Sequence, residues 1–162
     1  MSRLPSLSFY TKNATVCSMN DLASIESGVT HITVSNNCGN EIMASGLYFT
    51  RFTQLQEIVI GDNCFMNVGQ VNLIGLSKLT RVVIGMNSFT KKKNGYGEDP
   101  NRRFYVKNCP SLIELRIGRY SFSDYGVCEI ENANRLEVLE VGDLNQESYN
   151  FYSASVNLMR GR

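Results

Sequence analysis

An eleven-residue phrase recurs along this chain and constrains the fold more than any other feature, because repetition at a fixed period is typical of stacked architectures. Three copies begin at Leu55, Leu79 and Leu112, and each continues through a glycine to a phenylalanine. A fourth copy begins at Leu136 and keeps only the first half of the phrase, with Leu144 where the other copies have Asn or Tyr. A fifth, earlier copy is degenerate and retains Val29, Ile32, Val34 and Asn37.

The spacing of the copies defines the repeating unit. The four opening leucines lie 24, 33 and 24 residues apart, and the surplus in the longer interval falls in a polar stretch. A 24-residue unit with one basic insertion at 90–103 accounts for all three intervals. We therefore predict an array of about five repeats over 29–162, preceded by an N-terminal segment and cap at 1–28.

Apolar residues alternate within each copy, which predicts a strand with one face turned inward. The inward columns would be formed by Ile58 and Ile60, Val82 and Ile84, Leu115 and Ile117, and Leu139 and Val141. A weaker alternation precedes each opening leucine, as in Val71 and Leu73. The unit is then strand, turn, strand, turn, and we expect a β-rich fold of parallel sheets with little helix.

The residues after each first strand predict how the turn is built. Asn63 and Asn87 would satisfy unpaired backbone groups and repeat as a ladder between neighbouring units, which Tyr120 and Leu144 would interrupt. A glycine follows each strand, and we expect these positions to need backbone freedom. They are Gly61, Gly85, Gly118 and Gly142.

The phrase L-x-x-L-x-L-x-x-N-x-L is matched in full by the copies at 55–65 and 79–89, with phenylalanine in the last position. On this basis the chain resembles the leucine-rich-repeat family, in particular the β-rich members with two strands per repeat found among bacterial and protist surface proteins. The resemblance implies a right-handed superhelical solenoid that binds another protein, or a glycan, through its concave strand face. It implies no catalysis and no cofactor.

The outward residues of the first strands and the turns after them are the candidate binding residues. They are Glu57, Val59, Arg81, Val83, Met86, Glu114, Arg116, Arg119 and Glu140. Opposite charges alternate along these columns, and we expect Arg116 to face Glu140 and Arg119 to face Asp143. The competing interpretation is therefore a set of cross-strand pairs that only holds the register.

The insertion supplies a second candidate site. Its basic and aromatic residues are Lys91, Lys92, Lys93, Tyr96, Arg102 and Arg103, accompanied by glycines and a proline, so we expect a mobile loop. Such a loop could grip an acidic partner, a phosphate or a nucleic acid, or could simply be solvated. Nucleic acid is the least favoured partner, because 16 basic residues are balanced by 15 acidic residues over the whole chain.

The five cysteines are odd in number and none lies in a C-x-x-C pair, so neither a disulfide framework nor a zinc site is indicated. We expect reduced thiols, with Cys109 and Cys128 packed in the core. Cys38 and Cys64 occupy the same position of adjacent copies and would pair in an oxidising compartment. The single histidine, His31, has no companion that would make it catalytic, and no metal site is predicted.

The two ends of the predicted array differ. A short helix capped by Ser18 or Asn20 would cover the front, whereas no lid is predicted behind Val156 and Leu158. The chain is then either a fragment of a longer array or contacts a partner at this edge, and a structural role in an assembly or filament is the alternative function. The sequence shows neither a signal peptide nor a membrane span, so we expect a cytoplasmic protein, or an extracellular one if the chain is a fragment.

Overall fold

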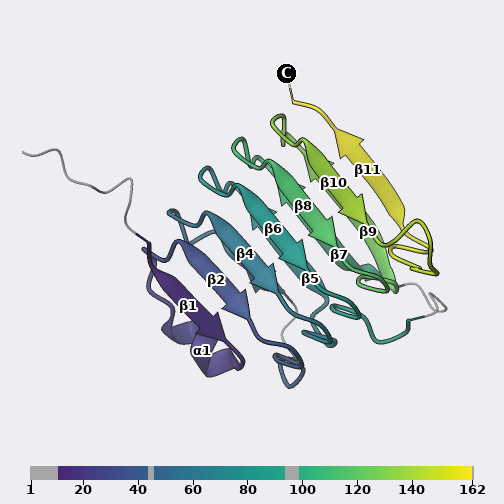
Figure 1. Ribbon diagram of the computed structural model, residues 1–162, viewed down its shortest axis with the longest axis horizontal. Helices are drawn as coiled ribbons and strands as arrows, with labels where there is room; N and C mark the ends of the chain where they lie inside the picture. The colour runs from purple at the N-terminus through teal and green to yellow at the C-terminus, as the bar shows by residue number, and fades with distance from the viewer. Residues whose placement is uncertain (1–10, 44–45, 94–98, 162) are drawn as a thin grey trace, which may run out of the picture.

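The computed structural model describes residues 11–43, 46–93 and 99–161, and these form two parallel β-sheets with one short helix (Figure 1). The six-stranded sheet contains, in spatial order, β1 (Asn13–Val16), β2 (His31–Val34), β4 (Glu57–Ile60), β6 (Arg81–Ile84), β8 (Glu114–Ile117) and β10 (Val138–Val141). The five-stranded sheet contains β3 (Leu47–Tyr48), β5 (Gln70–Ile74), β7 (Asp99–Lys107), β9 (Tyr125–Glu131) and β11 (Ser155–Met159). From β2 onward the chain alternates between the two sheets.

The register between strands follows the spacing of the sequence copies. Ile58 pairs with Val82, and Val82 pairs with Leu115, although the interval between the last two is the long one. Part of the surplus lies at the start of the long strand β7, where the pairing with β9 is irregular between Asp99 and Arg103. The predicted inward columns are confirmed through the middle of the molecule, because these side chains are at most 3% exposed from β4 to β8.

A column of phenylalanines fills the core beside the sheets. Phe65, Phe89, Phe122 and Phe151 stack with ring centroids 5.2, 4.9 and 5.1 Å apart. The first three are fully buried, and each lies two residues after a position with left-handed backbone. These rings hold successive copies at a constant separation.

From β2 to β10, the turn after each strand in the six-stranded sheet has left-handed backbone at the position of the predicted asparagine ladder. Asn37, Asn63 and Asn87 have φ values of 62°, 58° and 57°. The side-chain amide of Asn63 donates to the side-chain oxygen of Asn37 over 3.2 Å, so the predicted asparagine ladder is confirmed between these two turns. It does not continue to Asn87, whose side-chain oxygen is buried without a hydrogen-bond partner in the described structure. Asparagine tolerates this backbone region better than most other non-glycine residues.

The explanation predicted for the glycines is wrong at three of the four positions. Gly61, Gly85 and Gly118 do not have left-handed backbone, whereas Gly142 has a φ of 73°. A Cβ atom on Gly118 would lie 2.6 Å from the carbonyl of Gly85. Close approach of neighbouring copies, rather than turn conformation, therefore excludes a side chain at the first three sites.

A buried hydroxyl ladder runs beside the asparagines and was not predicted. The Ser88 hydroxyl donates to the Gly61 carbonyl over 2.8 Å and accepts from the Cys64 amide over 3.1 Å. Ser121 repeats both contacts one copy later, donating to the Gly85 carbonyl over 2.6 Å. Each hydroxyl satisfies backbone groups that would otherwise be buried without partners.

The fourth copy keeps the whole phrase, and the predicted drift at Leu144 is wrong. The amide of Tyr120 donates to the Ser148 carbonyl over 2.6 Å, as the Asn87 amide donates to the Arg119 carbonyl over 2.9 Å one copy earlier. Tyr149 therefore takes the ladder position, with a φ of 49°, and Phe151 joins the phenylalanine column. Residues 143–147 are an insertion within the turn.

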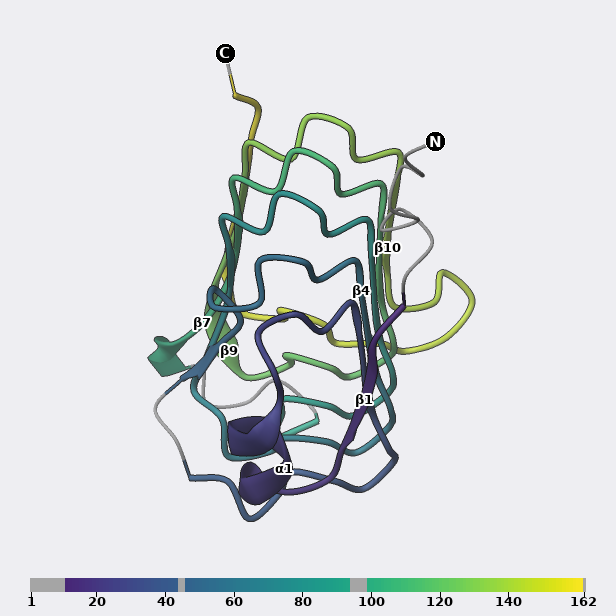
Figure 2. The same ribbon diagram turned by 90° about the vertical axis from the view of Figure 1, so that its left-hand side faces the viewer.

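The front of the molecule begins with β1, which lies inside the predicted N-terminal segment and pairs in parallel with β2. The helix α1 (Met19–Ser24) follows, with Ser18 as its N-cap, in agreement with one of the two predicted caps. Asp21 completes a capping box, and hydrogen bonds from the Cys17 and Ser18 amides lower its carboxyl pKa. In Figure 2, which faces this end, α1 lies beside β1.

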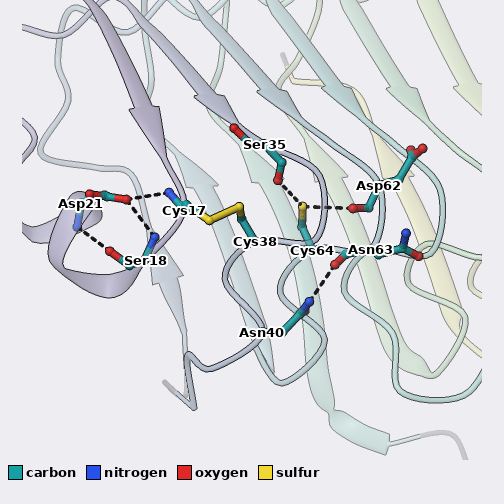
Figure 3. The surroundings of a disulfide bond; sticks show 9 residues. All are labelled: Cys17, Ser18, Asp21, Ser35, Cys38, Asn40, Asp62, Asn63 and Cys64. Atoms are coloured by element: carbon teal, nitrogen blue, oxygen red, sulfur yellow. Dashed lines mark hydrogen bonds between the residues drawn. A yellow bond between two sulfur atoms is a disulfide. The ribbon is translucent and has the colours of Figure 1, made fainter.

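The cysteine prediction needs correction. Cys17 and Cys38 form a disulfide, whereas Cys64 is a free, buried thiol whose sulfur donates to the Ser35 carbonyl over 3.1 Å (Figure 3). Neither five reduced thiols nor a Cys38–Cys64 pair is present, because β1 places Cys17 next to the turn that holds Cys38. Cys109 and Cys128 are buried as predicted.

Candidate functional site

The predicted binding face is the outer surface of the six-stranded sheet, and charge pairs cross it from strand to strand. Arg81 lies 3.4 Å from the carboxylate of Glu57 and 3.2 Å from that of Glu114. Arg116 contacts both Glu114 and Glu140, which confirms the predicted pairing with Glu140. Hydrogen bonding from Arg116 lowers the carboxyl pKa of Glu114.

These contacts neutralise most of the charge on the face, so they favour the interpretation that the pairs hold the register. On the same face, Val59 and Val83 are register neighbours on β4 and β6, and both are half-buried. Met86, in the turn after β6, is half-buried as well. A short apolar strip is therefore the part of this face that remains suited to a contact.

Arg119 does not pair with Asp143 as predicted. Its Nε donates to the Glu147 carbonyl over 2.9 Å, and its guanidinium lies over the Tyr120 ring, 5.1 Å from the centroid. The insertion at 143–147 is the physical reason, because it places Ser148 rather than Asp143 opposite this turn.

The predicted basic loop divides into exposed and buried parts. Lys91, Lys92, Lys93 and Arg103 are exposed, whereas Tyr96 lies outside the described residues. Arg102 is only 5% exposed and was wrongly predicted as a loop cation. Arg102 and Arg103 both belong to β7.

Arg102 instead stabilises the interior. Its Nε lies 3.4 Å from the Asp124 carboxylate, an ion pair without hydrogen-bond geometry, and its Nη2 donates to the Met66 carbonyl over 3.0 Å. The guanidinium also lies over the Tyr125 ring, 4.8 Å from the centroid. A buried charge needs such partners, so Arg102 is structural.

The C-terminal end of the two sheets exposes the apolar columns. Leu139 and Val141 of β10 are 40% and 43% exposed, whereas their neighbours in β8 are at most 3% exposed. Val156 and Leu158 of β11 are 52% and 60% exposed in the same way. β10 and β11 are the outermost strands of their sheets and lie at the same end of the molecule (Figure 1).

At the front end of the molecule, in contrast, the apolar core side chains are buried. Val16, in the outermost strand β1, is fully buried, and Ile25 just after α1 is 8% exposed. Leu22 of α1 packs against the core from this side. The two ends of the described structure therefore differ sharply in exposed apolar surface.

The described residues bring together no group of three metal-ligating side chains. The His31 ring lies 2.8 Å from the Thr30 hydroxyl through its Nδ1, with no carboxylate partner in the structure. No helix among the described residues is long and apolar enough to cross a membrane. Burial raises the pKa of the free thiol of Cys128 to about 12, which opposes thiolate formation.

Comparison with known proteins assigns no family. No protein-family model, no curated protein and no solved structure matches this chain.

Proposed function

We propose that this chain is a β-rich leucine-rich-repeat solenoid that acts as a non-catalytic protein-binding module, and that its C-terminal end is the contact surface. The solenoid interpretation is supported by the recurring phrase and by strands that pair in register from copy to copy. The contact surface is supported by one observation above all, the exposure of the apolar columns at β10 and β11.

The chemistry of this end suits a protein partner. Two outermost strands present unpaired backbone groups, and apolar side chains lie between them, which is the combination that strand edges use to associate. Covering one half-exposed leucine or valine contributes on the order of 1 kcal/mol. Leu139, Val141, Val156 and Leu158 together offer on the order of 4 kcal/mol before the cost of association is subtracted.

The occupant we propose is a second copy of the chain, joined end to end about a two-fold axis. Within the described residues, the front end offers no matching apolar surface for a head-to-tail filament, whereas a two-fold contact uses the same exposed surface on both copies. Because a two-fold axis across the stacking direction reverses the partner, the outermost strands would meet antiparallel.

A second candidate is contact through the sheet face, as the family resemblance implies. The observation that favours it is the half-buried pair Val59 and Val83, next to Met86. The partner in this case would be a different protein, with a glycan as the further alternative.

Sedimentation velocity over a range of concentrations tests the proposal. We expect a monomer–dimer equilibrium that Leu158→Lys or Val156→Lys weakens by about tenfold or more, since each puts a charge into an apolar contact. Val83→Lys is the matched control, because it adds the same charge to the sheet face. A monomer at all concentrations, or an equal effect of Val83→Lys, would contradict the proposal.

A further inference from the structure

Two insertions that are far apart in the sequence each contact the turn after β8, at Tyr120 and Arg119, and we call this region the corner. Lys93, from the basic insertion, places its amine 5.7 Å from the Tyr120 ring centroid. Glu147, from the insertion at 143–147, accepts a hydrogen bond from Arg119 at its carbonyl. In Figure 2 the segment after β10 projects beyond the six-stranded sheet. Insertions in repeat arrays often gather on the side that binds a partner.

Three tyrosines lie between these insertions. The ring centroids of Tyr120 and Tyr149 are 6.1 Å apart, and those of Tyr149 and Tyr152 are 5.0 Å apart in an edge-on arrangement. Tyr120 and Tyr149 occupy the ladder position that holds asparagine in the earlier copies. We call Tyr120, Tyr149 and Tyr152 the tyrosine cluster.

The tyrosine cluster is not needed to build the turn. Asparagine fits the same backbone in three earlier copies and connects the first two of them through the Asn63–Asn37 hydrogen bond, which tyrosine at this position gives up. The rest of the phrase, including Phe122 and Phe151, is retained. Departures from a consistent local pattern mark functional positions more often than structural ones. Tyr152, moreover, is 59% exposed.

Among the described residues, the cations beside the cluster have no carboxylate partners. Lys91, Lys92, Lys93 and Arg119 form no ion pair within the described residues, in contrast to Arg81 and Arg116 on the sheet face. The nearby Asp124 carboxylate is occupied by Arg102 and by the Lys91 amide. The described carboxylates therefore leave the positive charge at this corner available to a ligand.

The backbone of the lysines is held in place, which a mobile loop would not provide. The Lys91 amide donates to the Asp124 carboxylate over 3.1 Å, and the Thr90 hydroxyl donates to the Lys92 carbonyl over 3.2 Å. The Ser123 hydroxyl contacts the same carbonyl. Lys91 and Lys92 are thereby presented from a fixed backbone, which lowers the ordering cost of binding.

We propose that this corner recognises an acidic peptide segment of a partner protein. Lys91, Lys92, Lys93 and Arg119 pair with its carboxylates, and Tyr149 and Tyr152 pack against its apolar side chains. Tyrosine and arginine are enriched among the residues that dominate protein interfaces. The inference rests on the proposed protein-binding function but concerns a different surface from the C-terminal end.

Single-stranded nucleic acid shares the anionic chemistry but fits the rings less well. Base stacking requires free ring faces. Arg119 and Lys93 both lie over the Tyr120 ring, and the Tyr149 and Tyr152 rings meet edge to face. Few ring faces remain for a run of bases, so the observations favour a peptide.

Fluorescence anisotropy tests the proposal with two labelled probes, a peptide of alternating Glu, Asp and Phe, and oligo(dT) of similar charge. We expect the peptide to bind more tightly than oligo(dT), with an affinity that falls as salt is raised. The triple variant Lys91→Glu, Lys92→Glu, Lys93→Glu and the single variant Tyr152→Ala should each weaken peptide binding by about tenfold or more.

The matched control places the same charge change on exposed residues elsewhere, with Lys78→Glu, Arg135→Glu and Arg160→Glu combined. We expect this control to weaken binding by less than about threefold, because long-range charge effects are screened. Equal loss in the control, tighter binding of oligo(dT), or no peptide binding by folded protein would overturn the inference. Dimerisation measured on the same samples reports separately on the C-terminal end.

Discussion

The Cys17–Cys38 disulfide should contribute a large share of the stability of the front end. It closes a loop with a sequence separation of 21 residues, which contains α1 and β2 and begins directly after β1. The loop-closure relation for a cross-link of this length gives about 3 kcal/mol at 25 °C, chiefly by restricting the unfolded chain. Removing both cysteines should therefore lower the free energy of unfolding by about 3 kcal/mol.

The assay is urea unfolding followed by circular dichroism, on the protein with Cys17→Ser and Cys38→Ser and on the unchanged protein with and without reductant. Reductant should destabilise the unchanged protein by the same amount and leave the variant unaffected. Cys64→Ser is the control, since it leaves the Cys17–Cys38 disulfide in place, and reductant should destabilise it by the same amount as the unchanged protein. Equal stability of the variant, or peptide mapping that joins Cys38 to Cys64, would refute the reasoning.

Three further predictions concern single residues. Asp124→Asn should destabilise the protein by about 3 kcal/mol in urea unfolding, because it leaves the Arg102 charge buried without its carboxylate partner. Glu57→Gln, which removes an ion pair on the sheet face, should cost less than about 1 kcal/mol. Equal costs would contradict the difference between the buried and the exposed pair. Phe89→Ala should cost about 3–5 kcal/mol by opening the phenylalanine column, and a cost below about 1 kcal/mol would show that the column does not exist. The carboxyl pKa of Asp21 is lowered in the folded state, so its ionised form stabilises the fold. This stabilisation should be complete above the ordinary aspartate pKa and should disappear as the pH falls through the lower folded-state pKa. Asp21→Asn should flatten this acid dependence in NMR spectra of α1, and an unchanged pH profile would contradict the prediction.

The register of the paired strands was predictable because the same sequence phrase recurs at a fixed spacing, which averages out local ambiguity. Val82 and Leu115 could be placed in one inward column from spacing alone, and the structure pairs them. β1 escaped prediction because Asn13–Val16 carries too little of the phrase to be recognised as a copy. The Cys17–Cys38 disulfide was then also out of reach, since it depends on the position of β1.

The fourth copy contained a signal that could have been read. Ser148-Tyr149-Asn150-Phe151 parallels Arg119-Tyr120-Ser121-Phe122, and this match would have revealed the insertion and placed Tyr149 in the ladder. Leu144 obscured this match, because it lies at the same distance from Leu136 as the asparagine lies from the opening leucine in the earlier copies. The tyrosine cluster depends on this correction.

Arg102 shows a limit of a different kind. Its neighbours in sequence are polar and charged, so it resembles an exposed cation, yet it is buried against Asp124. That partner is brought close only by the pairing of β7 with β9. Burial of a charge follows from tertiary contacts, and a local pattern does not contain them.

The central claim is that the C-terminal end of the two sheets is a contact surface. Hydrogen exchange read by mass spectrometry, on the protein at low and high concentration, tests it directly. Association through this end predicts slower exchange at high concentration in β10 and β11, Val138–Val141 and Ser155–Met159, and unchanged exchange in β2 and β4. Slower exchange in β4 and β6 with none in β10 and β11, or no difference at any concentration, would contradict the claim.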